Sequence, residues 1–167
     1  MKDLYLPMKF LVTGGAGYIG SHMVKYLQDR SFKVDVIDNF STGNKWALQN
    51  CNVYEIDLLD KSGLDNILSK NNYNAVFHFA AKSLVSESFA NKQIYLDNNI
   101  TASENLLEGV IKYNIKNIIF SSTASVFGSV NSFKIDERHP KIPINTYGVT
   151  KLRFEEILRE KCRKLNI

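Results

Sequence analysis

The sequence predicts an α/β fold with a doubly wound, parallel sheet. Strand-length apolar runs alternate with segments of helical period, several of the runs are apolar on both faces, and a glycine-rich turn follows the first run. Strands that are apolar on both faces belong to a sheet that helices cover on both sides. Right-handed crossovers between such strands give a Rossmann-type sheet with the strand order 3-2-1-4-5.

Five segments have the pattern of strands. The clearest are the alternating KVDVID and the almost wholly apolar AVFHFAA. The predicted strands are 9–13, 33–38, 53–58, 75–81 and 117–122. We interpret the first, fourth and fifth of them as apolar on both faces, as expected for strands inside a covered sheet.

Four segments have helical period, and they fall between the strands and after the last one. The predicted helices are 19–30, 61–70, 94–113 and 146–165, with a proline-containing loop at 129–145. The buried face of the first is expected at Ile19, Met23, Tyr26 and Leu27. The apolar stripe of the last is expected at Phe154, Leu158, Cys162 and Leu165.

Composition excludes several classes of protein. The 167 residues carry 21 Lys and Arg against 17 Asp and Glu, and 44% are apolar, so we expect one domain with a full core. No apolar run is long enough to span a membrane, and the mild positive charge fits a solvated helix face better than a nucleic-acid site. Two cysteines without CxxC spacing indicate a reducing cytoplasm, and three scattered histidines make a metal site improbable. Because Met8 resembles a start, we expect residues 1–7 to be an extension and 8–167 the domain.

The strongest motif is the turn TGGAGYIG, which follows the first predicted strand and opens the first helix. Gly14, Gly17 and Gly20 have GxxGxxG spacing. Small residues here allow a tight turn, let the backbone approach a pyrophosphate, and let the helix pack closely on the strand. The amides of the first helical turn then face the phosphates. The position of the motif favours dinucleotide binding over a plain turn.

Acidic residues close the next two strands. Asp38 lies about 20 residues beyond the glycines, where a carboxylate bonds the adenosine ribose and repels a 2′-phosphate, so NAD is favoured over NADP. Asp57 and Leu58 lie where an adenine ring would be framed. For these two, an ordinary turn is nearly as good an explanation.

Tyr147 and Lys151 have YxxxK spacing, which places both on one helix face. An ammonium close to a phenol stabilises the phenolate, which can then act as a base toward a sugar hydroxyl. A surface pair is the default explanation of such spacing. The hydroxyl run from Ser121 to Thr123 at the end of the fifth strand favours a catalytic role for the pair, because ligands bind at the carboxyl ends of the strands.

Together these segments resemble the extended short-chain dehydrogenase/reductases, in the NAD-dependent epimerase/dehydratase group, and most of all the UDP-glucose 4-epimerases. The resemblance runs from about Met8 to the end of the chain and rests on TGGAGYIGSH, IDNFSTG, HFAAKSLVSES, YLDNN, FSSTASVFG and YGVTK. The 4,6-dehydratases of this group carry an Asp-Glu pair after the Thr of the fifth strand. This chain has Ala124 and Ser125 there, so dehydration lacks its acid/base pair.

The resemblance implies NAD as cofactor and a role for each matching residue. Thr123 would bond the reacting 4-hydroxyl, Tyr147 would be the base, and Lys151 would bind the nicotinamide ribose and tune Tyr147. The cofactor contacts implied are Gly14, Gly17, Tyr18, Ile19, Gly20, Asp38, Asn39, Asp57, Leu58, Phe79, Ala80, Ala81, Ser83, Asn98, Ser122, Tyr147 and Lys151. The chain departs from the group at Ser83, Thr146 and Phe127, where a Lys, a Pro and a Tyr are found in other members. None of these changes removes a catalytic group.

The implied activity is interconversion of UDP-glucose and UDP-galactose by transient oxidation at C4, in a homodimer. The family continues with a sixth strand and a substrate domain, which this chain lacks, so we expect little activity from it alone and an exposed edge at the fifth strand. Two alternatives stay open: an epimerase of another UDP-sugar, such as UDP-GlcNAc or UDP-glucuronate, or a non-catalytic NAD-binding remnant.

Overall fold

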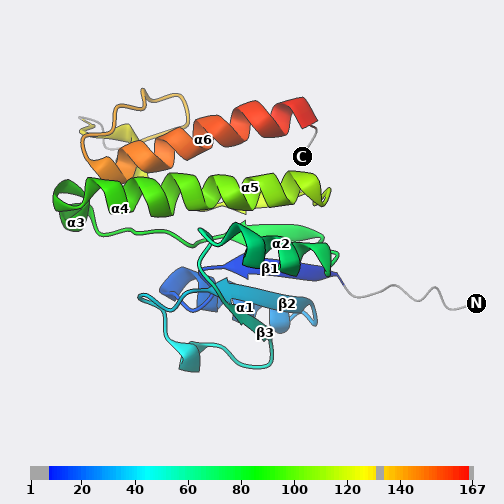
Figure 1. Cartoon of the computed structure of the whole chain (residues 1–167). Helices are drawn as coiled ribbons and strands as arrows, with labels where there is room; N and C mark the ends of the chain where they lie inside the picture. Colours follow the sequence, from blue (N-terminus) through cyan, green and yellow to red (C-terminus); the bar gives the residue numbers. More distant parts are fainter. Residues whose placement is uncertain (1–7, 131–133, 166–167) are drawn as a thin grey trace, which may run out of the picture.

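The structure is a computed structural model that describes residues 8–130 and 134–165. The predicted extension at residues 1–7 lies outside the described part. The sheet has five parallel strands, β1 (Lys9–Thr13), β2 (Lys33–Asp38), β3 (Asn52–Glu55), β4 (Ala75–His78) and β5 (Ile118–Phe120). Their order is β3-β2-β1-β4-β5, which confirms the predicted topology (Figure 1).

Helices cover both faces of this sheet. They are α1 (Tyr18–Gln28), α2 (Lys61–Ser69), α3 (Val85–Ala90), α4 (Lys92–Leu96), α5 (Ala102–Lys112) and α6 (Thr146–Leu165). Short 3₁₀ turns span Lys45–Ala47 and Ala124–Phe127, and a π-helix at Asp97–Thr101 joins α4 to α5. In Figure 1, α4 and α5 therefore run as one long helix, with α6 beside it and α1 on the other side of the sheet.

Two apolar clusters hold the layers together, one on each face. The larger joins Leu11, Ile37 and Val76 of the strands to α2 and α5. The smaller joins Val12 and Val36 to α1. The strand residues alternate between the clusters, because successive side chains of a strand point to opposite faces. The sheet is therefore buried between two layers of helices, and the ends of its strands remain accessible.

The face of α1 that we predicted is wrong in part. Leu27 is buried as predicted, but Ile19 and Tyr26 are more than half exposed, and the helix buries Gly20 and Val24 in their place. Because Gly20 has no side chain, the backbone of α1 comes close to the turn that follows β1, and the side of the helix that carries Gly20 becomes its buried face. Pattern counting gives glycine no weight and so selected the neighbouring face.

The fifth strand is also less covered than predicted. Phe120 packs against α6 in a third cluster with Leu107, Phe154 and Ile157. Ile119 points to the other face and is 42% exposed. Among the described residues β5 is an edge strand, since its only partner in the sheet is β4.

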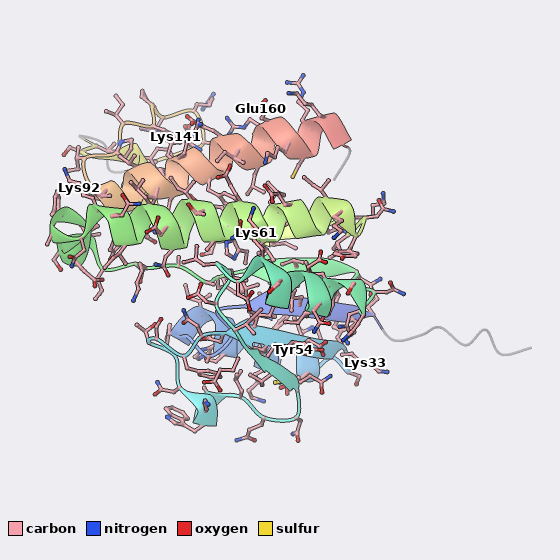
Figure 2. All side chains as sticks on the ribbon, viewed as in Figure 1. Lys33, Tyr54, Lys61, Lys92, Lys141 and Glu160 are labelled. Atoms are coloured by element: carbon pink, nitrogen blue, oxygen red, sulfur yellow. The ribbon has the colours of Figure 1, made fainter. Side chains whose placement is uncertain are left out.

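The outer surface of the helical layer is charged. Lys92 and Glu160 lie on α4 and α6 away from the sheet, as Figure 2 shows. No helix in the described part of the chain is long and apolar enough to cross a membrane.

Candidate functional site

The carboxyl ends of the strands surround one cavity. Parallel sheets bind ligands at this edge, at the point where neighbouring strands lead to helices on opposite faces. Here β1 continues into α1 and β4 continues toward α3. The cavity lies between these exits and extends from the β2 loop to α6.

The glycine turn forms the floor of the cavity. The amide of Gly14 donates to the carbonyl of Ile37 at 2.8 Å, which ties the end of β1 to the end of β2. Gly14 has φ +68°, and a Cβ there would lie 2.5 Å from the amide nitrogen of Ala80. Only glycine satisfies both the left-handed backbone and this approach to the segment after β4.

The other two motif glycines differ in what surrounds them. A Cβ on Gly20 would overlap the carbonyl group of Gly14, so this glycine is needed for packing. A Cβ on Gly17 would meet only the carbonyl oxygen of Gly14, at 3.3 Å. Gly17 therefore faces open space, and its lack of a side chain keeps the start of α1 accessible.

The start of α1 has the properties of an anion site. Gly17 is the N-cap residue, and the first amide bonded within the helix is that of Ser21, which donates to the carbonyl of Gly17 at 2.9 Å. The amides of the three residues between them are the free donors of a helix N-terminus. Tyr18, Ile19 and Gly20 line the cavity, where the helix dipole favours negative charge.

Asp38 is held at the end of β2 with both carboxylate oxygens bonded to the backbone. One oxygen accepts from the amide of Ala16 at 2.9 Å and the other from that of Phe40 at 2.8 Å. The residue is 8% exposed and lines the cavity. Each carboxylate oxygen can accept a second bond, so Asp38 can bind a ligand hydroxyl while it fixes the glycine turn.

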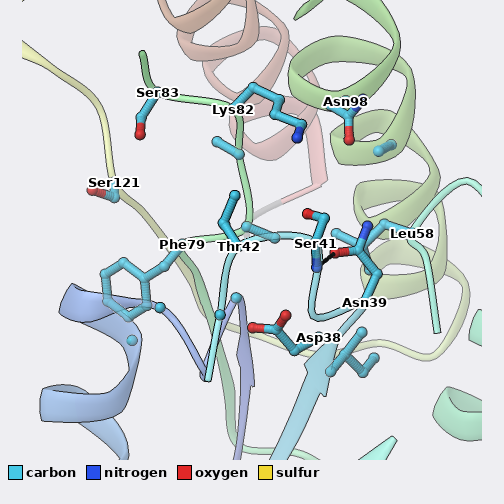
Figure 3. Close-up of a pocket in the computed structure, with 18 of the residues that line it drawn as sticks. Asp38, Asn39, Ser41, Thr42, Leu58, Phe79, Lys82, Ser83, Asn98 and Ser121 are labelled. Atoms are coloured by element: carbon cyan, nitrogen blue, oxygen red, sulfur yellow. Dashed lines mark hydrogen bonds between the residues drawn. The ribbon is translucent and has the colours of Figure 1, made fainter. Parts of the chain in front are cut away.

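Asn39 and Asp57 are joined across the two neighbouring strand ends. The side-chain amide of Asn39 donates to Asp57 at 2.7 Å. Its side-chain oxygen accepts from the amide of Ser41 at 3.0 Å, a bond drawn in Figure 3. The other oxygen of Asp57 accepts from the amide of Leu59 at 2.8 Å. These bonds shape one end of the cavity and keep Leu58 against it.

Most of the predicted cofactor residues line this cavity. They are Gly14, Gly17, Tyr18, Ile19, Gly20, Asp38, Asn39, Asp57, Leu58, Phe79, Ala80, Ala81, Ser83, Asn98, Tyr147 and Lys151. Ser121, from the predicted hydroxyl run, lines it as well, and the remaining lining residues, which the sequence motifs did not indicate, are Ile37, Ser41, Thr42, Gly43, Ile56, Lys82 and Ala102. Figure 3 shows Ser41, Thr42 and Lys82 around the same space as Asp38 and Asn98. The hydroxyl-bearing residues of the segment Ser41–Gly43 were the sequence feature that could have indicated this part of the cavity lining.

Lys151 is almost completely buried beside the end of β5. Its ammonium donates to the carbonyl of Ser121 at 2.9 Å and lies 4.6 Å from the ring centre of Phe120 and 5.9 Å from that of Tyr147. The residue is 3% exposed, and burial lowers the pKa of its ammonium to about 8. Tyr147 and Lys151 both border the cavity, as the YxxxK spacing predicts.

The pKa of Lys151 leads to a prediction about stability. The folded chain releases this proton near pH 8 and the unfolded chain near 10.5, so stability contributed by this group rises between these two values. Below pH 8 the buried charge costs free energy. We expect Lys151→Met to be more stable than wild type at pH 7 by about 1–2 kcal/mol, after allowance for the lost hydrogen bond.

Thermal denaturation at pH 7 and pH 9.5 tests this, with Lys92→Met at an exposed position as the control. The advantage of Lys151→Met should shrink at the higher pH. A variant less stable than wild type at pH 7, or a difference independent of pH, would contradict the prediction.

Ser122 and Thr123 are placed differently from the rest of the predicted set. The hydroxyl of Ser122 donates to Glu155 of α6, whose other oxygen pairs with Lys141, and Ser121 lines the cavity instead. The Thr123 hydroxyl accepts from the amide of Ser125 at 3.2 Å and caps the following 3₁₀ turn. Neither residue is among those that line the cavity. Their predicted contacts with nicotinamide and substrate remain predictions.

Behind the cavity, His78 is buried between two hydroxyls. Its ring nitrogens lie 2.7 Å from the Thr13 oxygen and 2.8 Å from the Ser103 oxygen. Burial, with a smaller contribution from the charge of Lys151, lowers the pKa of His78 to about 3. The ring is therefore neutral and joins β1, β4 and α5 as a structural group.

A model of the NAD dependent epimerase/dehydratase family matches residues 10–167. The chain belongs to this family. The match confirms the resemblance found in the sequence motifs. Within the family, the chain is 42% identical over 150 residues to a UDP-glucose 4-epimerase of Halalkalibacterium halodurans and 41% identical over 161 residues to that of Bacillus subtilis.

Solved structures of epimerases have the same fold. A UDP-glucose 4-epimerase of Brucella ovis in complex with NAD superposes with a TM-score of 0.93 at 36% identity and covers 96% of this chain. One from Thermotoga maritima with UDP-glucose gives 0.93 at 37% identity. This chain covers 49% and 53% of those two structures, and 45% and 48% of the two curated relatives. It spans about half their length.

Proposed function

We propose that this chain binds NAD and forms the cofactor half of a UDP-glucose 4-epimerase, which interconverts UDP-glucose and UDP-galactose. One observation carries the proposal: Tyr147 and Lys151 border the same cavity as the glycine turn and Asp38. A dinucleotide on the turn and a base beside its reactive end would thus share one cavity.

The residues present fit NAD. Gly17 leaves room beside the free amides of α1 for a diphosphate. Asp38 offers carboxylate oxygens to a ribose diol and would repel a 2′-phosphate. Asp57 and Leu58 would frame the adenine. Lys151 would bind the nicotinamide ribose.

The chemistry divides between cofactor and protein. When bound, NAD supplies the site that accepts a hydride from the C4 carbon of the sugar and returns it. Tyr147 would take the proton of the 4-hydroxyl and give it back to that oxygen, after the 4-keto sugar has turned over so that the hydride returns to the opposite face of C4. The ammonium of Lys151 would stabilise the phenolate, and Thr123 would donate to the sugar oxygen.

The choice of UDP-sugar stays open between UDP-glucose and related sugars. A structure named as a UDP-Glc/GlcNAc 4-epimerase of Campylobacter jejuni matches at 36% identity with a TM-score of 0.91. A chimera tests the activity, with residues 1–167 in place of the corresponding part of the B. subtilis relative. Turnover of UDP-glucose would support catalysis by this half of the enzyme, whereas the choice of sugar in the chimera would reflect the substrate domain of the relative. NAD binding without any turnover would favour the non-catalytic alternative.

We further propose a homodimer in the cytoplasm, with a UDP-sugar substrate and with no nucleic acid or membrane partner. Two half-buried free cysteines that pack against different apolar clusters support a reducing compartment. The NAD-binding domain would begin near residue 8, and the family match over residues 10–167 supports this start.

Asp38→Asn tests the cofactor assignment in the chain itself. The new side chain has one acceptor oxygen instead of two, and its NH₂ would face one of the backbone amides that Asp38 accepts from, so NAD affinity should fall about 10- to 100-fold. The preference for NAD over NADP should also shrink. Isothermal titration calorimetry with both nucleotides measures this, with the exposed Asp29→Asn as a control. Unchanged NAD affinity would refute the role of Asp38.

A further inference from the structure

The charged side chains that line the cavity differ in whether they have a partner. Asp38 and Asp57 are the carboxylates of the lining, and Lys82 and Lys151 are its cations. Each carboxylate accepts from the backbone, and the Lys151 ammonium donates to the carbonyl of Ser121. The ammonium of Lys82 has no hydrogen bond, ion pair or ring contact within the part of the chain that the structure describes. It is therefore available to a ligand.

The backbone of Lys82 is held firmly although its side chain is not. The side-chain oxygen of Asn99 accepts from the Lys82 amide at 2.8 Å, and the side-chain NH₂ of Asn99 donates to the Lys82 carbonyl at 2.9 Å. Two residues on, the carbonyl of Leu84 accepts from the hydroxyl of Tyr95 at 2.6 Å. Because the segment is already fixed, a ligand of the ammonium has to order only the side chain itself.

The segment that carries Lys82 lies against the glycine turn. A Cβ on Gly14 would lie 2.5 Å from the amide nitrogen of Ala80. Lys82 follows two residues later, and consecutive Cα atoms are about 3.8 Å apart, so the Cα atoms of Ala80 and Lys82 lie within about 8 Å of each other. Figure 3 shows the Lys82 side chain directed toward Asn98 of the long helix. The ammonium and the free amides of α1 thus border one cavity near the same turn.

A diphosphate bound in this cavity needs a positive charge close to it. The start of α1 contributes only about half an elementary charge, and the carboxylates of Asp38 and Asp57 oppose an anion. The ammonium of Lys151 is bonded at the end of β5. Lys82 is left as the lining cation that can approach the phosphates. A lysine ammonium is a compact charge with three donors, which suits phosphate oxygens.

We propose that the ammonium of Lys82 binds the diphosphate of the dinucleotide. The inference rests on the proposed NAD function and adds to it a binding residue that the sequence motifs did not indicate. A hydrogen bond between two charged groups is about twice as strong as one between neutral groups, and salt weakens it where water has access. Since a UDP-sugar also carries a diphosphate, the experiment has to separate the two ligands.

Calorimetric titration of the purified chain with adenosine, ADP and NAD tests this contact. Lys82→Met removes the charge and keeps most of the apolar length of the side chain. It should weaken ADP and NAD about tenfold and adenosine by less than about twofold, because adenosine has no phosphate. Lys82→Arg keeps the charge, so ADP and NAD should bind within about threefold of wild type.

Lys92→Met is the matched control, because it removes the same charge from an exposed position of α4. All three affinities should stay at the wild-type level. Raising the salt concentration from about 0.05 M to about 0.5 M should weaken NAD more in wild type than in Lys82→Met. Adenosine binding also reports that each variant is folded.

The outcomes separate the two proposals. If wild type does not bind NAD, the proposed function fails. If wild type binds NAD but Lys82→Met weakens all three ligands equally, or weakens none, the role of Lys82 alone is overturned. A loss seen with UDP and not with ADP would also overturn it, because the cation would then serve the diphosphate of the substrate. Selective weakening of ADP and NAD, with rescue by Lys82→Arg, supports it.

Discussion

Tyr147→Phe is expected to lower epimerase turnover in the chimera with the B. subtilis relative by about a thousandfold. The change removes one oxygen, and with it the group that would take the proton of the 4-hydroxyl. The phenyl ring keeps its place near Lys151, whose ammonium stays bonded to Ser121. NAD affinity of the isolated chain should therefore change by no more than about threefold.

The matched control is Tyr26→Phe, which removes the same oxygen from an exposed tyrosine of α1. Turnover and NAD affinity should both stay at the wild-type level. If Tyr147→Phe retained near-normal turnover, another group would have to be the base and the catalytic assignment would be wrong. If it lost NAD binding as well, the tyrosine would serve binding rather than proton transfer.

Gly20→Ala and Gly17→Ala are expected to differ although both add one methyl group to the same turn. The methyl on Gly20 would overlap the backbone of Gly14, so α1 would have to move away from β1. We expect Gly20→Ala to lower the free energy of unfolding by about 3 kcal/mol or more. It should also lose NAD binding. The methyl on Gly17 meets one carbonyl oxygen at 3.3 Å and otherwise enters the space meant for the diphosphate. This variant should fold nearly as well as wild type and bind NAD about tenfold or more weakly.

Urea denaturation and calorimetric titration of the two variants provide the measurement. Equal stability of Gly20→Ala and wild type would mean that helix and strand are less closely packed than the structure has them. Wild-type NAD affinity in Gly17→Ala would place the diphosphate away from the start of α1.

The elements best predicted from the sequence are those fixed by local chemistry. The last helix has the predicted bounds, because Asn145 caps it by accepting from the amide of Gly148 at 2.7 Å and an apolar stripe follows. The glycine turn, Asp38 and the YxxxK pair also lie where their spacing indicated. In each case the signal and the structure that it determines lie within a few residues of one another.

The features that were missed depend on contacts between distant segments. Lys82 lines the cavity because Asn99 fixes its backbone, and nothing next to Lys82 in the chain announces this. Ser122 is turned toward Glu155, a residue of α6 that no local pattern connects to it. The helix predicted over 94–113 likewise did not reveal the π-helix, because one extra residue in a wider turn changes the spacing of the apolar residues too little to be seen in the sequence.

That π-helix has a consequence for how the chain tolerates changes in length. A π turn holds one residue more than the α-helical turn that it replaces. Deleting one residue from 97–101 would replace the π turn by an ordinary α-helical turn, and α4 would keep nearly the same direction relative to α5. Tyr95 lies before the turn and could still donate to the Leu84 carbonyl. Only four positions would remain for five residues, so the residues of the turn, among them Asn98 at the cavity and Asn99 at the Lys82 backbone, could not all keep their places. A surface loop such as 134–145 can absorb a lost residue, whereas this buried turn has a fixed residue count.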